Sequence, residues 1–79
     1  MNREEVFEEL KEVIMVVRPA IDLNSVSFDT RLVEDLGLDS LSMMLISMAI
    51  ENKLGVRFDS NSHFITVADV CDAAIGLMK

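Results

Sequence analysis

The sequence predicts an all-α protein, an antiparallel bundle of three long helices. Three segments carry apolar residues at intervals of three and four, the spacing that buries one face of a helix, and they span residues 3–17, 40–54 and 66–78. Alternating apolar and polar runs never exceed a few residues, so no sheet is expected. The 79 residues suit one domain, residues 1–79, with a thin core.

The first helix is expected over residues 3–17. Its non-apolar faces are acidic, and Glu4 and Glu5 stand in the first turn, where negative charge complements the helix dipole. Pro19 ends the helix, because the residue before a proline is pushed out of helical conformation. A long connection, residues 18–38, follows. The apolar residues along it predict that it is pinned across the core and is not loose.

The second helix is expected over residues 40–54, with Asp39 as its N-cap and Gly55 as its C-terminal stop. Residues 56–65 form a linker, with a short helix expected around residues 60–64. Thr66 and Asp69 have the spacing of a capping box and open the last helix.

Composition excludes several classes of function. The net charge of −7 disfavours binding to nucleic acid or to anionic membranes, and no apolar stretch approaches the roughly 20 residues that span a bilayer. A single cysteine, Cys71, forms neither an internal disulfide nor a zinc site. The N-terminal segment lacks the apolar run of a signal peptide, so we expect the chain in the cytoplasm, or in an organelle matrix after processing. We also expect a monomer without stable membrane insertion.

No enzymatic or metal site is expected. His63, the only histidine, stands in a polar loop, and the residues around Ser40 lack the second glycine of a nucleophile elbow. The acids Glu34, Asp35 and Asp39 do not have the spacing of a calcium-binding EF-hand loop. A small serine hydrolase is therefore disfavoured.

The most informative segment is residues 33–41, which leads into the second helix. Ser40 stands at the first helical position, where unpaired backbone N–H groups and the positive end of the helix dipole favour a phosphate ester on its hydroxyl. The alternative is that Asp39 and Ser40 form only a helix cap.

Residues 34–41 (EDLGLDSL) resemble the attachment motif of acyl carrier proteins. The acidic first helix, the long loop, residues 50–55 (IENKLG) before Phe58 and Asp59, and residues 65–70 (ITVADV) match the family in the same order. The resemblance covers nearly the whole chain, at the usual length of a stand-alone member.

The resemblance implies that a phosphopantetheinyl transferase joins 4′-phosphopantetheine to Ser40, giving a phosphoprotein. The thiol of this cofactor would carry acyl groups as thioesters between acyl-transferring and condensing enzymes of fatty-acid, polyketide or specialised lipid biosynthesis. Asp39, Ser40 and Leu41 correspond to the attachment motif, while Asp35 and Glu51 correspond to acidic contacts for client enzymes. Glu34 adds to the negative charge that would attract a basic enzyme.

The second helix departs from the familiar fatty-acid carriers, because Glu51 is its only acid. Two apolar stripes run along this helix. One of them, with Ile46, Ile50 and Leu54, suits the core. The other would lie on the outer face beside Ser40 and comprises Leu41, Met44, Leu45 and Met48. Our hypothesis is that partners bind this outer stripe; the alternative is that the long loop covers it.

Two other functions remain open. The cargo could be an amino acid or peptide, as in aminoacyl, D-alanyl and peptidyl carrier proteins. Alternatively, the chain could keep the carrier fold as an interaction module that receives no arm.

Overall fold

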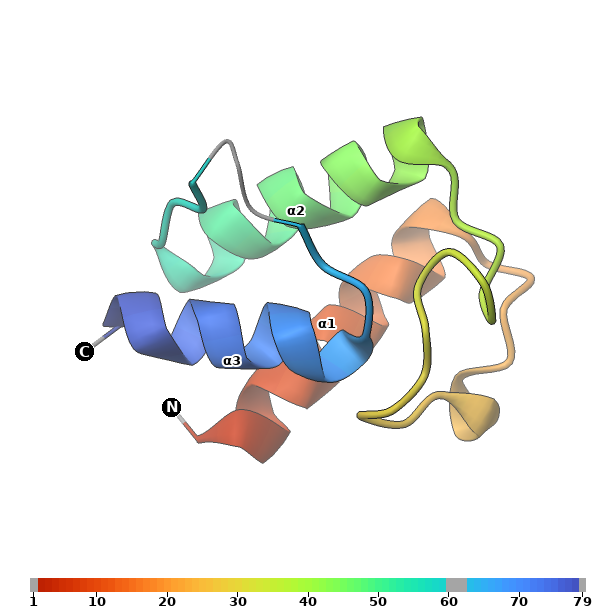
Figure 1. Ribbon diagram of the computed structural model, residues 1–79, viewed down its shortest axis with the longest axis horizontal. Coiled ribbons are helices and arrows are strands. Elements are labelled where there is room, and N and C mark those ends of the chain that lie inside the picture. Colours follow the sequence, from red (N-terminus) through yellow and green to blue (C-terminus); the bar gives the residue numbers. More distant parts are fainter. Residues whose placement is uncertain (1, 60–62, 79) are drawn as a thin grey trace.

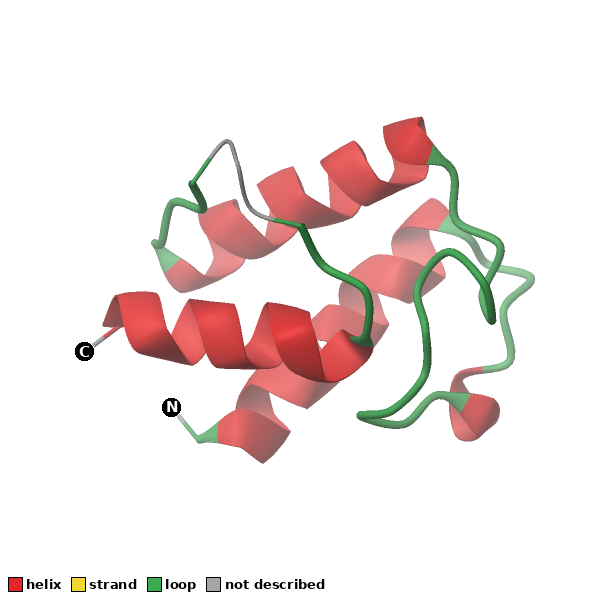
Figure 2. Ribbon diagram, in the orientation of Figure 1, coloured by secondary structure: helices red, strands yellow, loops and turns green. Residues whose placement is uncertain are grey.

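The computed structural model describes residues 2–59 and 63–78, and within them the chain is helical (Figure 1). The α-helices are α1, Arg3–Val17, α2, Ser40–Leu54, and α3, Val67–Met78; a short 3-10 helix, η1, spans Leu23–Ser25. Figure 2 shows helices joined by loops, and the described residues contain no strand. The all-α prediction is confirmed.

Both ends of α1 are set by local chemistry. The Asn2 side chain accepts a hydrogen bond from the Glu5 amide at 2.9 Å, and the Glu5 carboxylate accepts one from the Asn2 amide at 2.9 Å. This reciprocal capping box begins the helix. At the other end Arg18, which precedes Pro19, leaves helical conformation with φ −136° and ψ 80°.

The core lies where α1 packs against α2 and α3. In Figure 1, α1 runs antiparallel to both of these helices, which run in the same general direction. The long loop also contributes, since Val26, Leu32 and Leu38 are buried, so the prediction that it is pinned across the core is confirmed. The other core residues are Val6, Leu10, Val13, Ile14, Ile46, Ile50, Val67, Val70, Cys71 and Ala74.

Backbone hydrogen bonds fasten the long loop to the start of α3. The Leu32 amide donates to the Ile65 carbonyl, and the Val67 amide donates to the Thr30 carbonyl, both at 2.9 Å. The predicted capping box is present: the Asp69 amide donates to Thr66 Oγ1 at 3.2 Å, and the Thr66 amide donates to Asp69 Oδ2 at 3.0 Å. These bonds fix the loop before it reaches α2.

The sequence also predicts a short helix before α3. The short helix expected around residues 60–64 falls largely on residues 60–62, outside the described residues. Counting that short helix, the expected bundle has four helices; this is corrected, because the described residues form three α-helices. Their short 3-10 helix, η1, lies between α1 and α2, where the Asp22 side chain accepts a hydrogen bond from the Asn24 amide at 3.0 Å. None of the helices in the described ranges is long and apolar enough to cross a membrane.

Candidate functional site

Ser40 is the first residue of α2 and is exposed. Asp39 precedes it in extended conformation and turns its carboxylate toward the helix, where Oδ1 accepts a hydrogen bond from the Ser42 amide at 2.7 Å. This bond and that from the Ser42 hydroxyl, aided by Arg18, lower the pKa of Asp39 below its usual value. The predicted N-cap is confirmed, and it leaves the Ser40 side chain at the helix mouth.

Arg18 ties the end of α1 to this helix start. Its guanidinium donates to the Gly37 carbonyl at 3.2 Å and to Ser42 Oγ at 3.4 Å, and lies 4.0 Å from Asp39 Oδ2. Sequence reasoning missed this role, because nothing near Arg18 in the chain indicates which distant loop its side chain reaches. Arg18 holds the turn that presents Ser40.

Gly37 permits the turn into α2. Its φ of +67° lies in the left-handed region that side chains disfavour, whereas a Cβ there would meet nothing within 4 Å. Glycine is therefore needed here for its backbone conformation and not for a close approach of neighbouring atoms. Leu38, next along the chain, is buried and anchors the segment in the core.

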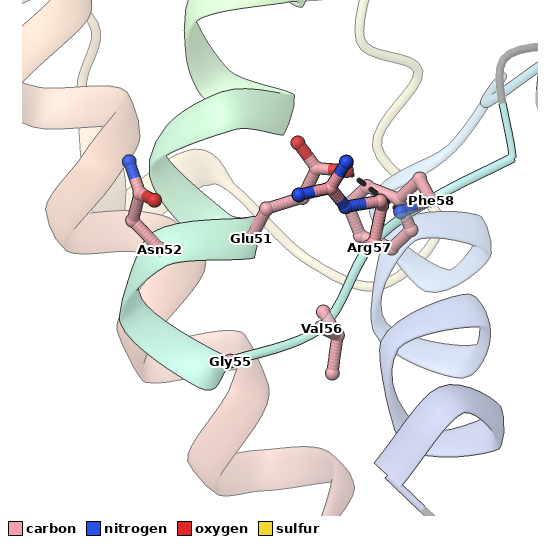
Figure 3. Close-up of a pocket in the computed structure, with 6 residues that line it drawn as sticks. All are labelled: Glu51, Asn52, Gly55, Val56, Arg57 and Phe58. Atoms are coloured by element: carbon pink, nitrogen blue, oxygen red, sulfur yellow. Dashed lines mark hydrogen bonds between the residues drawn. The ribbon is translucent and has the colours of Figure 1, made fainter.

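Glu51, which the sequence assigned to client contacts, is half-buried and fastens the linker to α2 (Figure 3). Its Oε2 accepts a hydrogen bond from the Phe58 amide at 2.7 Å. Phe58 in turn packs edge-on against Phe64, with ring centroids 5.0 Å apart. The structure thus assigns Glu51 an internal role that its sequence position did not signal.

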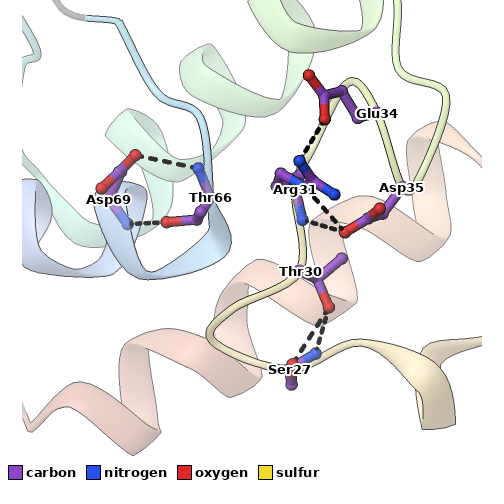
Figure 4. A network of polar contacts seen from close by, with 7 residues as sticks. All are labelled: Ser27, Thr30, Arg31, Glu34, Asp35, Thr66 and Asp69. Carbon is purple, nitrogen blue, oxygen red and sulfur yellow. Dashed lines mark hydrogen bonds and ion pairs between the residues drawn. The ribbon is translucent and has the colours of Figure 1, made fainter.

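The acids on the loop side of Ser40 are paired with Arg31 (Figure 4). The Arg31 guanidinium lies 2.6 Å from Glu34 Oε2 and 3.8 Å from Asp35 Oδ2, and the Arg31 amide donates to Asp35 at 2.8 Å. Both carboxylates remain exposed. They are accessible to a partner, but Arg31 already offsets much of their negative charge.

The outer stripe of α2 is exposed, as expected if the loop does not cover it. The exposed fractions are 63% for Leu41, 58% for Met44, 46% for Leu45 and 53% for Met48. The opposite face, with Ile46 and Ile50, is buried. The alternative of a covered stripe is therefore wrong.

Ser40 also borders a surface groove between α2 and the linker. Most of its lining is apolar, with polar groups from Asp39, Ser40 and Ser47 on α2 and its cap, and from Glu51, Asp59 and His63 toward the linker. The apolar lining residues are Val33, Leu38, Met43, Met44, Phe58, Phe64 and Ile65. The groove joins the exposed hydroxyl to an apolar surface.

Chemistry beyond this site is limited in the described part of the chain. There, no group of three or more histidine, cysteine or acidic residues could hold a metal ion. His63 lines the same groove as Ser40, but no hydrogen bond joins the two side chains among the described contacts. Burial raises the pKa of the Cys71 thiol to about 11, so it is protonated at neutral pH and is a core residue.

Comparison with known proteins gives a consistent result. The family described as phosphopantetheine attachment site matches residues 4–74, which include every site residue described above. The chain is 38% identical over 68 residues to the acyl carrier protein of Campylobacter hominis, covering 84% of this chain and 85% of that protein. It is 36% identical over 76 residues to the acyl carrier protein of Campylobacter fetus (94% and 97%), and 34% over 71 residues to that of Thermotoga maritima (87% and 86%).

Proposed function

The chain belongs to the acyl carrier protein family, and on that premise we propose that Ser40 is the residue that bears its 4′-phosphopantetheine arm. A member of this family is a carrier and not an enzyme, and it interacts with a phosphopantetheinyl transferase and with acyl-handling enzymes. The observation that carries the proposal is the exposed Ser40 hydroxyl at the start of α2, within the sequence EDLGLDSL. Asp39 and Leu41 complete the attachment motif.

The surroundings of Ser40 suit a phosphodiester. Attachment forms a bond between Ser40 Oγ and phosphorus, breaks the pyrophosphate bond of coenzyme A, releases adenosine 3′,5′-bisphosphate and transfers the hydroxyl proton to the enzyme's base. The first-turn amides and the positive end of the α2 dipole favour a negative charge there. Arg18, 4.0 Å from Asp39, offsets the neighbouring carboxylate.

We infer that the cargo is an apolar acyl chain, because the groove beside Ser40 is lined mainly by aliphatic and aromatic side chains. The pathway would be fatty-acid, polyketide or specialised lipid biosynthesis in the cytoplasm. To distinguish an acyl carrier from an aminoacyl, D-alanyl or peptidyl carrier, the arm is loaded with acyl or with aminoacyl groups and the melting temperatures are compared. An acyl chain in the groove raises the melting temperature above that of the arm alone, and an equal rise with a charged aminoacyl group would contradict the inference.

Intact mass spectrometry tests the attachment site. Incubation with coenzyme A and a broad-specificity phosphopantetheinyl transferase is expected to add one phosphopantetheinyl group to the chain and none to Ser40→Ala. The matched control is Ser47→Ala, because this serine of α2 lines the same groove. It is expected to be modified like the unaltered chain.

Both variants should keep the fold, because Ser40 is exposed and Ser47 is half-buried. An unchanged mass of the correctly folded chain would instead favour an interaction module that receives no arm. Modification that persists in Ser40→Ala would move the attachment to another residue.

A further inference from the structure

Exposed apolar side chains flank Ser40 from both sides and not only from α2. We name this group the apolar collar: Val33 from the loop, Leu41 and Met44 from α2, and Ile65 from the linker. Their exposed fractions are 56%, 63%, 58% and 66%. Val33, Met44 and Ile65 line the same groove as Ser40, and Leu41 is its neighbour in the chain.

The two members outside α2 are held in place by the backbone. The Leu32 amide donates to the Ile65 carbonyl at 2.9 Å, which fixes the loop carrying Val33 beside the linker carrying Ile65. The Ile65 amide donates to Asp69 Oδ2 at 2.9 Å, which ties the same residue to the cap of α3. The collar is therefore a preorganised surface, and a partner that covers it loses little entropy in ordering it.

Beside Ser40 on its loop side, most of the charge is paired. Two arginines, Arg18 and Arg31, lie against the three carboxylates of Glu34, Asp35 and Asp39, which leaves about one negative charge uncompensated. Two further acids, Glu51 and Asp59, also line the groove. From Ser40 to Ile50, α2 carries no charged residue. A partner approaching Ser40 therefore meets an apolar surface with charged and polar residues at its rim, the pattern that marks interaction sites.

We propose that the phosphopantetheinyl transferase docks by covering the collar with an apolar rim around its own active site, and that Val33 and Ile65 help to determine which transferase accepts this chain. The proposal rests on Ser40 being the attachment residue, because the enzyme must then reach the centre of the collar. A second copy of this chain is a poorer occupant. Four side chains supply only a small part of the roughly 1,600 Å² of surface that a standard stable interface buries. A transient enzyme complex can form with a smaller buried area.

The test compares the kcat/KM of modification for the unaltered chain and for Val33→Thr/Ile65→Thr, with coenzyme A and a broad-specificity transferase. Threonine keeps the β-branch of both side chains, and the main-chain bonds at Leu32 and Ile65 do not use the altered atoms. We expect kcat/KM to fall about tenfold, mainly through KM, as when exposed apolar contacts are lost from an interface. Leu77→Thr, an equally large exposed residue near the C-terminal end of α3, is the control and should be neutral.

Salt provides a second readout. Between about 0.05 M and about 0.5 M NaCl, which screens exposed charges, kcat/KM should change by less than about threefold. A double variant modified as fast as the unaltered chain, or a fall of more than about tenfold with salt, would overturn the collar while leaving Ser40 as the attachment residue. An unaltered chain that receives no arm would instead contradict the proposed function. Circular dichroism confirms that the compared chains are folded.

Discussion

At the scale of single residues, Asp39 both caps α2 and places a stabilised negative charge beside Ser40. Its carboxylate accepts the Ser42 amide at 2.7 Å, and its pKa is lowered by the hydrogen bonds from Ser42 and by Arg18. A carboxyl with a lowered folded-state pKa stabilises the fold at pH values above its unfolded pKa. That stability is lost as the pH falls through the folded-state value. The stabilising charge of Asp39 is therefore fully present at neutral pH.

We predict that Asp39→Asn lowers the melting temperature at pH 7 and that this deficit shrinks to nothing in acid. Asparagine still caps the helix by accepting from the Ser42 amide, but it has no charge to attract Arg18 or to complement the dipole. Thermal unfolding of both chains, followed by circular dichroism from neutral pH to below the usual pKa of 3.8, measures the difference. A deficit of constant size across that range would show that the hydrogen bond, and not the charge, carries the effect.

At the scale of elements, α2 has two apolar faces with different roles. Ile46 and Ile50 are at most 2% exposed, whereas Leu41 and Met44 are more than half exposed. We predict that Ile46→Ala or Ile50→Ala costs about 2–5 kcal/mol of unfolding free energy, because each leaves a cavity in the core. Leu41→Ala or Met44→Ala should change it by no more than about 0.5 kcal/mol and should slow modification of Ser40.

Urea unfolding and the modification assay, applied to the same four variants, measure both quantities. A loss of several kcal/mol in Leu41→Ala or Met44→Ala would assign those side chains to the core. If Leu41→Ala and Met44→Ala are both modified at the normal rate, the exposed face of α2 is not part of the surface that the partner contacts.

The bounds of α1 and α2 were predictable because their end signals are local. Pro19 excludes further helix, Asp39 caps the next one, and Gly55 takes the left-handed conformation with φ 67° that ends it. The 3-10 helix η1 was missed, although Asp22, two residues before Asn24, is itself a local turn signal. Asn2 with Glu5 was another readable capping box.

The site was predictable only in part, since its remaining contacts join distant segments. The exposed stripe of α2 follows from helix periodicity alone. The contacts of Arg18 with Gly37 and of Glu51 with Phe58 depend on how the loop and the linker fold back, and no spacing in the sequence encodes that. Acids near Ser40 were visible, but their pairing with Arg31 was not.

At the scale of the whole molecule, acidic residues outnumber basic ones by 14 to 7, and α1 brings several acids close together. Lys53 of α2 lies between two of them, with Nζ 2.6 Å from Glu9 Oε2 and 2.9 Å from Glu12 Oε2. These hydrogen bonds raise the pKa of Lys53. A group whose pKa is raised by folding stabilises the folded state fully at pH values below its unfolded-state pKa. This stability is lost as the pH rises through the folded-state pKa, so the contribution of Lys53 is intact at neutral pH.

We predict that Lys53→Gln lowers the melting temperature at low ionic strength and that added salt restores part of it. Without Lys53, Glu9 and Glu12 repel each other at the contact between α1 and α2, and salt screens that repulsion. Lys11→Gln removes the same charge from a pair within α1, where Nζ lies 3.0 Å from Glu8, so it separates bridging between helices from net charge. Calorimetry across a salt series should show that, at low salt, Lys53→Gln lowers the melting temperature more than Lys11→Gln does. Equal deficits would mean that net charge, and not the bridge between α1 and α2, governs the stability of this acidic fold.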